Sequence, residues 1–472
     1  MDKLTWLVKW SNYYYFKDKP VHASGITLDK DSITLTTAWQ TEQLTATVTP
    51  EDAVNKKVIW TSSDTSVATV SSTGLVTCVT PGTCTITATC ADSGANASCW
   101  VSSYVPKTFT ISWTEQSNMS SGWTYSDDAA WLTAWSTDFD EFFWYSAVRL
   151  NTSWQETAEI TQEQSWWAGK LDITQLWTLT SGDNVMIKFP VRWIKMTKNW
   201  SVVTLSITDW LGRESEWYQY YAHCTWTLSN PWTPKSAFYL WSYKASWYNP
   251  LRSWSWQPIL ASEYQSTFCT LAKANGSWYN IIGFYQRQYI NALYIMKYWN
   301  PDSQSVIWKW YTRWSGVPTT WWTNNQTNAT YWTSSATQQV KLFWLEDWWW
   351  WITEWVWGIY TDWNQQLYTM LSDWSWTLSW WEWTWTTIQH TWSYYNLSSI
   401  AGNNKAMFAP IATVNSPSYN TYYSDGVTAY ASSLAYAGGS RNSEAVAWVL
   451  SIEVIAGTSA AGGYIGSRLM FL

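Results

Sequence analysis

The placement of tryptophan limits how this chain can fold more than any other feature of its sequence. The chain contains 48 tryptophans among 472 residues but only 20 glycines. Several tryptophans follow Asn or Asp between strand-like runs, at Asn199-Trp200, Asp209-Trp210, Asp362-Trp363 and Asp373-Trp374. A tight turn at such a place needs a positive φ, which glycine adopts freely and a residue with a Cβ does not. The pattern is therefore typical of turns that contain glycine, but the sequence has tryptophan at the glycine positions.

One hypothesis explains this placement. Some uncultured bacterial lineages, and phages that infect them, read the UGA codon as glycine, so a translation that reads UGA as tryptophan produces this pattern. Under this hypothesis Trp60, Trp349 and Trp355 are our candidates for true tryptophans. The alternative is a Trp-rich carbohydrate binder, although stacking platforms do not need indoles in turns.

Residues 24–103 alternate between apolar and polar side chains in short runs, such as Ile26–Leu28 and Val67–Val70. Turn residues separate the runs every 8–12 positions, which predicts an all-β sandwich. The string VIWTSSDTSVATVSSTGLVTCVTPGTCTITAT (58–89) closely resembles the bacterial Ig-like group 2 domain. In that family Trp39 would be a glycine. The resemblance implies a rigid spacer, our default interpretation, or a weak surface adhesin.

Four of the six cysteines lie in this module. Cys84 and Cys90 share the parity of the apolar residues and should face the core, as small buried hydrophobes or as half of a disulfide. Cys90 and Cys99 flank ADSGANAS and are the best pair if a disulfide exists. Their spacing matches no zinc ribbon. Cys224 and Cys269 are isolated, so we expect no catalytic thiol.

The charge distribution argues against several classes of partner. The net charge is −7 and no basic block occurs, so we expect neither nucleic acid nor an anionic membrane as a partner. The three histidines lie far apart in the sequence, so we expect no His-rich metal centre. The apolar stretch 445–455 is too short to span a bilayer. Residues 1–23 lack the apolar core of a signal peptide and are interpreted as an attachment arm.

The middle of the chain reads as β-rich, with one acidic segment and one helix. Asp138, Asp140 and Glu141 suggest either a cation site or, preferably, a helix start or turn. The run 185–209 predicts two or three strands joined by a turn at 198–200. A helix is predicted over 279–298 from the apolar period of Ile282, Tyr285, Tyr289, Ala292, Leu293 and Met296.

The segment FWLEDWWWWITEWVWGI (343–359) resembles the core motif of the C-type-lectin-like fold of formylglycine-generating-enzyme relatives. The resemblance makes Trp344 and Trp350 glycines, and Trp349 and Trp355 core aromatics. Trp351 and Trp357 replace a usual Asn and Asp. The strings at 248–258 and 300–312, and Tyr464–Leu469, also follow this family and extend the resemblance over about 180–472. It implies that Arg468 anchors the last strand through an ion pair with Glu346 or Glu354.

No catalytic grouping is visible. The formylglycine-generating enzyme, after which that family is named, needs a cysteine pair in its C-terminal half. This chain has no Cys after Cys269. His390 lies in a Thr-rich loop and is expected to be a surface residue. We therefore expect no enzyme activity and no cofactor, with a structural calcium left open.

The C-terminal tail is dominated by Ser, Tyr, Ala, Asn, Gly and Val. Some proteins of this family branch are variable targets of diversity-generating retroelements, whose mutated codons give this set of residues. By position in the motif, the expected exposed ligand-binding residues are Tyr436, Ser440, Asn442, Glu444, Trp448, Leu450, Ile452, Thr458 and Ala460. The alternative is that these are ordinary strand and loop residues of a fixed lectin-like domain.

Together these features predict a mainly β chain with some α: an Ig-like β-sandwich followed by a C-type-lectin-like α+β domain. The expected boundaries are 1–23 for the arm, 24–104 for the Ig-like domain, 105–180 for a β-rich linker domain and 181–472 for the receptor-binding domain. The resemblances imply a non-enzymatic phage tail fibre or prophage host-recognition protein in the virion tail. The alternative is a bacterial cell-surface adhesin or a retroelement variable protein. The expected partner is a host-surface protein or glycan; a homotrimer and other tail proteins are left open.

Overall fold

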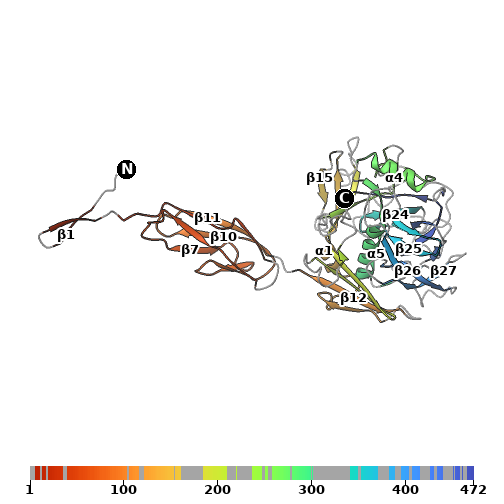
Figure 1. Cartoon of the computed structure of the whole chain (residues 1–472), viewed down its shortest axis with the longest axis horizontal. Helices are drawn as coiled ribbons and strands as arrows, with labels where there is room; N and C mark the ends of the chain where they lie inside the picture. Colours follow the sequence, from red (N-terminus) through yellow and green to blue (C-terminus); the bar gives the residue numbers. More distant parts are fainter. Residues whose placement is uncertain are drawn as a thin grey trace. The chain divides into compact units, whose positions relative to one another are not determined.

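The structure is a computed structural model, and its chain divides into two compact units, Met1–Pro106 and Lys107–Leu472 (Figure 1). It describes residues 6–10, 13–17, 20–35, 40–103, 106–115, 122–151, 153, 155–160, 184–209, 219–220, 237–246, 250–253, 258–276, 279–298, 300, 341–348, 352–369, 382–387, 395–402, 407–414, 426–429, 433–438, 450, 452–457, 460 and 465–471. Within these ranges no helix combines the length and the apolar character needed to cross a membrane.

The first unit begins with a β-hairpin and continues into a β-sandwich. In the hairpin, β1 (Trp6–Trp10) pairs antiparallel with β2 (Tyr13–Lys17). The sandwich strands are β3 (Gly25–Leu28), β4 (Ser32–Leu35), β5 (Thr41–Gln43), β6 (Ala46–Thr49), β7 (Val58–Ser62), β8 (Ala68–Val70), β9 (Leu75–Cys78), β10 (Gly82–Cys90) and β11 (Asn96–Ser103). They form a four-stranded sheet β4-β11-β10-β7, a three-stranded sheet β5-β9-β8 and the pair β3-β6. The strands predicted from the alternating pattern are thus confirmed.

The sandwich core follows from that alternation. Inward-facing residues of β10 and β11 are fully buried, including Ile86, Ala88 and Val101. Trp60 packs beside both core clusters of the module. Gly74, at φ +86°, lies so close to it that an added Cβ would meet the Trp60 ring at 2.7 Å. Trp60 thus packs tightly against the Gly74 turn, and its being a true tryptophan stays a prediction.

The cysteines of the sandwich are buried free thiols. In the β10–β11 ladder Cys99 lies opposite Ile86, while Cys90 lies opposite Val58 of β7. The expected facing of Cys90 and Cys99 across the hairpin is therefore wrong, because the register places Thr89 opposite Asn96. Cys84 and Cys90 face the core, as their parity predicts.

The second unit contains three larger sheets. The first has the order β13-β12-β18-β17-β19, from β12 (Thr108–Thr114), β13 (Thr124–Asp127), β17 (Trp193–Asn199), β18 (Val202–Thr208) and β19 (Gln219–Tyr220). The second has the order β15-β14-β16-β20-β33-β21, from β14 (Ser146–Leu150), β15 (Glu156–Ile160), β16 (Asn184–Pro190), β20 (Ala237–Trp241), β21 (Tyr279–Ile281) and β33 (Leu469–Phe471). β12 pairs with β18, and β14 pairs with β16, so these strands between residues 108 and 150 share sheets with later strands of the unit.

The third sheet contains the C-terminal strands. Its order is β26-β25-β24-β30-β31-β29-β27-β28, and β32 also pairs with β24. The strands are β24 (Thr353–Thr361), β25 (Gln366–Thr369), β26 (Glu382–Thr387), β27 (Tyr395–Ile400), β28 (Pro410–Val414), β29 (Gly426–Ala429), β30 (Leu434–Ala437), β31 (Ile452–Ala456) and β32 (Ile465–Gly466). A small hairpin of β22 (Lys341–Leu342) and β23 (Leu345–Glu346) precedes it.

Three described helices belong to this unit. The acidic segment forms α1 (Asp138–Phe143), which confirms the helix interpretation. The predicted helix over 279–298 is correct only from Phe284: α5 spans Phe284–Tyr298, and residues 279–281 are strand β21. Sequence reasoning did not predict α4 (Gln265–Lys273). The chain is thus mainly β with a few short helices.

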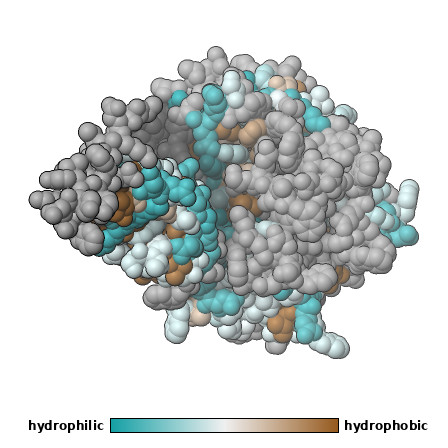
Figure 2. Space-filling view, turned by 60° about the vertical axis from the view of Figure 1, so that its left-hand side comes forward, coloured by the Kyte–Doolittle hydropathy of each residue, from teal (hydrophilic) through white to brown (hydrophobic). Residues whose placement is uncertain are grey.

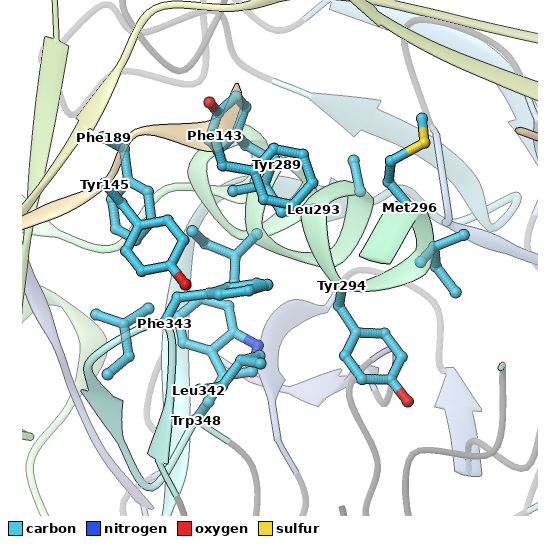
Figure 3. Close-up of a cluster of buried hydrophobic side chains, with 14 of the residues drawn as sticks. Phe143, Tyr145, Phe189, Tyr289, Leu293, Tyr294, Met296, Leu342, Phe343 and Trp348 are labelled. Carbon is cyan, nitrogen blue, oxygen red and sulfur yellow. The ribbon is translucent and has the colours of Figure 1, made fainter. Parts of the chain in front are cut away.

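Helix α5 lies at the centre of the unit, beside the sheet that contains β24 (Figure 1). All of its residues are buried, including its polar ones, which is typical of a helix enclosed on every side. Figure 3 shows Tyr289, Leu293 and Met296 of this helix gathered with aromatic side chains from several elements. Phe143, Phe189 and Phe343 belong to the same core cluster. The core therefore joins α1, β16, α5 and the β22–β23 hairpin.

Candidate functional site

The motif at 343–359 builds the most distinctive site of the second unit. It begins in the β22–β23 hairpin, whose two loop residues Phe343 and Trp344 have φ +48° and +65°. Positive φ at both central positions is the geometry of a type I′ turn, which strongly favours Asn-Gly or Gly-Gly. Trp344 thus has a backbone conformation that glycine adopts freely, as its predicted place in the motif requires.

Glu354 of β24 lies at the centre of a fully buried charge cluster. Its Oε1 is 2.9 Å from Arg468 Nε and 3.4 Å from Lys244 Nζ. Its Oε2 is 3.2 Å from Arg287 Nη1, which comes from α5. The side chains of all four residues are at most 2% exposed. One carboxylate thus joins three cations that come from distant parts of the chain.

The pKa values of the cluster reflect burial and charge together. Burial alone would raise the pKa of Glu354, but Arg468, Lys244 and Arg287 outweigh burial and hold it below its ordinary value. Burial lowers the pKa of Lys244 to about 8, although Glu354 opposes that shift. Burial likewise lowers the pKa of Lys341 in the hairpin to about 7, with Glu346 opposing. Burial therefore lowers the pKa of Lys244 inside the cluster and of Lys341 in the neighbouring hairpin.

Arg468 connects the last strand to the rest of the unit. Its Nη1 donates to the carbonyl oxygens of Trp241 and Ser242 at 2.6 and 2.7 Å. Its Nη2 donates to the carbonyl oxygen of Glu346. The predicted ion pair of Arg468 is confirmed with Glu354, while its contact with Glu346 is through the backbone. The guanidinium thus fixes the end of β20, the β22–β23 hairpin and β24 to the residue that precedes β33.

This cluster can position strands but cannot bind an external ligand directly, because none of its charged groups reaches solvent. Removal of one partner of such a buried pair leaves the other charge uncompensated in a medium of low polarity. This lowers the free energy of unfolding by several kcal/mol. The cluster therefore acts as a rigid support for the strands around it. No three His, Cys, Asp or Glu in the described residues are grouped closely enough to hold a metal.

The structure corrects part of the nominated ligand-binding surface. Tyr436, Leu450 and Ile452 are 5%, 3% and 4% exposed, so their side chains belong to the core. Tyr436 packs edge-on against Trp355, with ring centres 5.8 Å apart. The reason is packing against other elements, because Tyr436, Ile452 and Leu450 each belong to a buried core cluster of the second unit. The expected exposure of these three residues is therefore wrong.

The other nominated residues have different outcomes. Ala460 is half-buried beside the core. Ser440, Asn442, Glu444, Trp448 and Thr458 lie outside the described residues. So do Trp39, Trp210, Trp349, Trp350, Trp351, Trp374, Cys224 and His390. On the face shown in Figure 2, the coloured surface is mostly hydrophilic or neutral, with hydrophobic residues in small separate patches.

Backbone geometry bears on the tryptophans elsewhere in the unit. Among the residues that the structure describes, ten non-glycine residues have positive φ, and four of them are tryptophan: Trp135, Trp144, Trp200 and Trp344. Tryptophan makes up only about a tenth of the chain, 48 of 472 residues, and bulky residues seldom adopt this conformation. Trp200 is the first residue of the two-residue β17–β18 loop, where a type II′ turn takes glycine. The prediction of positive φ is thus confirmed at Trp200.

The turn at Asp362-Trp363 differs from its prediction. Trp363 has an ordinary backbone conformation, and the positive φ of this turn, +61°, is at Gln365. The Asp362 side chain organises the turn by accepting hydrogen bonds from the backbone N–H groups of Asn364 and Gln366, each at 2.8 Å. A longer turn capped by an aspartate places its left-handed residue later than a two-residue turn does.

Comparison with known proteins identifies the class of the N-terminal module. Residues 23–101 match the family of bacterial Ig-like domains of group 2. The sandwich of the first unit is therefore a bacterial Ig-like domain, and such domains are typical of cell-surface bacterial proteins.

Two curated relatives are similar over this module. An uncharacterized protein of Clostridium acetobutylicum is 48% identical over 83 residues, which are 17% of this chain and 8% of that protein. An alpha-L-arabinofuranosidase of Bifidobacterium longum is 51% identical over 77 residues, 16% of this chain and 7% of that protein. The chain thus spans less than a tenth of the length of either relative. A crystal structure of an intimin mutant from EHEC O157:H7 is 18% identical, with a TM-score of 0.15, over 21% of this chain and 55% of that one.

Proposed function

We propose that this chain is a non-enzymatic surface-binding protein of the bacterial adhesin class. The observation that supports it is the group 2 bacterial Ig-like domain at residues 23–101, a module typical of cell-surface proteins. In this proposal the Ig-like domain is a spacer, and the second unit provides the principal binding domain.

The second unit is proposed to have a C-type-lectin-like fold. Three features support this proposal. The motif at 343–359 provides the central glutamate and a core aromatic, Glu354 and Trp355. The closing strand β33 lies between β20 and β21, so the end of the chain is paired with earlier strands of the unit. Arg468, which precedes β33, pairs with the buried Glu354 and so stabilises this strand pairing. A domain that is closed in this way gives a stiff frame, which suits loop-based recognition.

A narrower setting is a phage tail fibre or prophage host-recognition protein, with the C-terminal region diversified by a retroelement. The same binding unit would serve either setting. The flanking genes distinguish them: tail genes place the chain in a virion, and a reverse transcriptase beside a near-copy template repeat indicates diversification.

We further propose that many of the tryptophans are glycines in the native protein, encoded by UGA. The left-handed backbone of Trp135, Trp144, Trp200 and Trp344 supports this proposal. Peptide mass spectrometry of the protein from its native cells tests it. Glycine masses at these four positions are expected, and an intact tryptophan at position 200 would overturn the proposal.

Binding of the labelled full chain to a panel of intact bacterial and host cells, measured by flow cytometry, tests the proposed function. Saturable binding that unlabelled chain displaces is the expected result. Absence of such binding from every cell type would contradict it. The enzymatic alternative is tested by incubating the chain with a sulfatase-type peptide. Oxidation of the peptide's cysteine to formylglycine would overturn the non-enzymatic assignment.

A further inference from the structure

The outer face of the sheet β4-β11-β10-β7 in the Ig-like domain has an unusual composition. Alternate residues of these strands point away from the core, because their neighbours line it. The outward residues are Ser32, Thr34, Ile59, Thr61, Thr83, Thr85, Thr87, Thr89, Asn96, Ser98, Trp100 and Ser102. We call this set the hydroxyl face. Figure 1 shows β7, β10 and β11 side by side within it.

The register arranges these hydroxyl groups in rows. Thr87 lies between Ser98 and Thr61, and its Oγ1 is 3.3 Å from Ser98 Oγ. Trp100 lies between Thr85 and Ser32. Rows in a sheet are about 4.8 Å apart across the strands, and same-face residues are about 6.7 Å apart along them. The result is a regular array of groups that can each donate and accept a hydrogen bond.

Trp100 is the large side chain of this array and is 53% exposed. Its ring adds nothing to the core, which the inward residues Cys99 and Val101 fill. It lies within a strand and does not have positive φ, unlike the four tryptophans in glycine conformations. A strand position needs no positive φ, so the backbone does not mark Trp100 as a recoded glycine; the site proposed below takes it to be a tryptophan, whose exposed ring can contact a partner. Trp is among the residues that most often dominate binding surfaces.

The hydroxyl face also lacks charge. None of its residues is Asp, Glu, Lys or Arg, although charged residues such as Asp31, Lys57 and Asp92 lie just beyond its strand ends. A neutral face offers nothing to a phosphate or carboxylate polymer, because such partners need cations. It complements a partner that is itself uncharged and rich in hydroxyl groups.

We propose that the hydroxyl face is a second binding site, which takes a neutral polysaccharide. Sugar rings would stack on the Trp100 indole, and their hydroxyl groups would exchange hydrogen bonds with the Thr and Ser rows beside it. This site belongs to the Ig-like domain, so it is independent of any ligand of the second unit.

Affinity electrophoresis of the full chain tests this site, in gels that contain neutral arabinan, xylan or β-glucan, with acidic polygalacturonate as comparison. Retardation by at least one neutral polymer and none by polygalacturonate is expected. Trp100→Ala and Thr87→Glu should each weaken binding about tenfold or more, and Trp100→Tyr should restore much of it. The matched control is Thr47→Glu, at an exposed position of β6 outside this sheet, which should bind like the parent chain. Circular dichroism verifies folding of each variant.

The outcomes that overturn the site are equally definite. Retardation by none of the neutral polymers, or equal weakening by Thr47→Glu, would refute it. Retardation by polygalacturonate alone would show that the partner is acidic and would also refute it. Cell binding by the Trp100→Ala variant at the parental level would leave the proposed function intact, so the two failures are distinguishable.

Discussion

Replacement of Trp200 by glycine should stabilise the β17–β18 hairpin. Trp200 has φ +56° and is 92% exposed, so removal of its ring sacrifices almost no buried surface. The left-handed conformation costs an L-residue with a Cβ about 1–2 kcal/mol. Glycine removes that cost but adds about 0.4–1 kcal/mol of unfolded-chain entropy. The difference predicts that Trp200→Gly raises the free energy of unfolding of the hairpin by about 0.8 kcal/mol.

Trp363→Gly is the matched control, because it removes an equally large ring that is 83% exposed but has no positive φ. There only the entropic term remains, so a loss of about 0.4–1 kcal/mol is expected. Hydrogen exchange of the amides of β17 and β18, together with urea unfolding followed by circular dichroism, measures the Trp200 effect locally and globally. Two variants that destabilise equally would refute the argument from backbone strain.

Three further predictions concern the buried groups. Glu354→Gln should cost about 3–5 kcal/mol in urea unfolding, because it leaves buried cations such as Arg468 uncompensated; a change below 1 kcal/mol would show that the cluster does not support the unit. The native pKa of Lys341 is about 7, below its ordinary value of 10.5. Between these two pH values the unfolded state binds more protons than the native state, so the free energy of unfolding should rise with pH above 7. This group contributes at most about 1.4 kcal/mol per pH unit. Lys341→Met should remove that slope, and an unchanged slope would contradict the assignment. Gly74→Ala should lower the melting temperature of the Ig-like domain, since its Cβ would collide with the Trp60 ring, and an unaltered calorimetric transition would contradict it.

The local pattern was sufficient to predict the Ig-like domain and parts of the second unit. Alternation sets the strand faces of β10 directly, because side chains of a strand point to opposite sides in turn. Motif and charge also indicated a helix start or turn at α1 and limited the ion-pair partner of Arg468 to Glu346 or Glu354. In each case the relevant interaction is either local or restricted to a few ionisable residues.

The failures have a common physical cause in long-range pairing. Ile452 is buried because it packs in one core cluster with Phe284 of α5 and Val356 of β24, and no pattern near residue 452 reports that packing. The facing of Cys90 and Cys99 depended on a hairpin register that the sequence leaves open. The convergence of Lys244 and Arg287 on Glu354 joins residues more than 60 positions apart. Such contacts exist only once the sheets have assembled.

The proposal of a surface-binding protein is tested most directly by a binding isotherm of the purified full chain on intact cells. The account predicts saturation at a finite number of sites per cell, with displacement by excess unlabelled chain. Uptake that rises linearly with concentration and resists displacement, on every cell type offered, would contradict it.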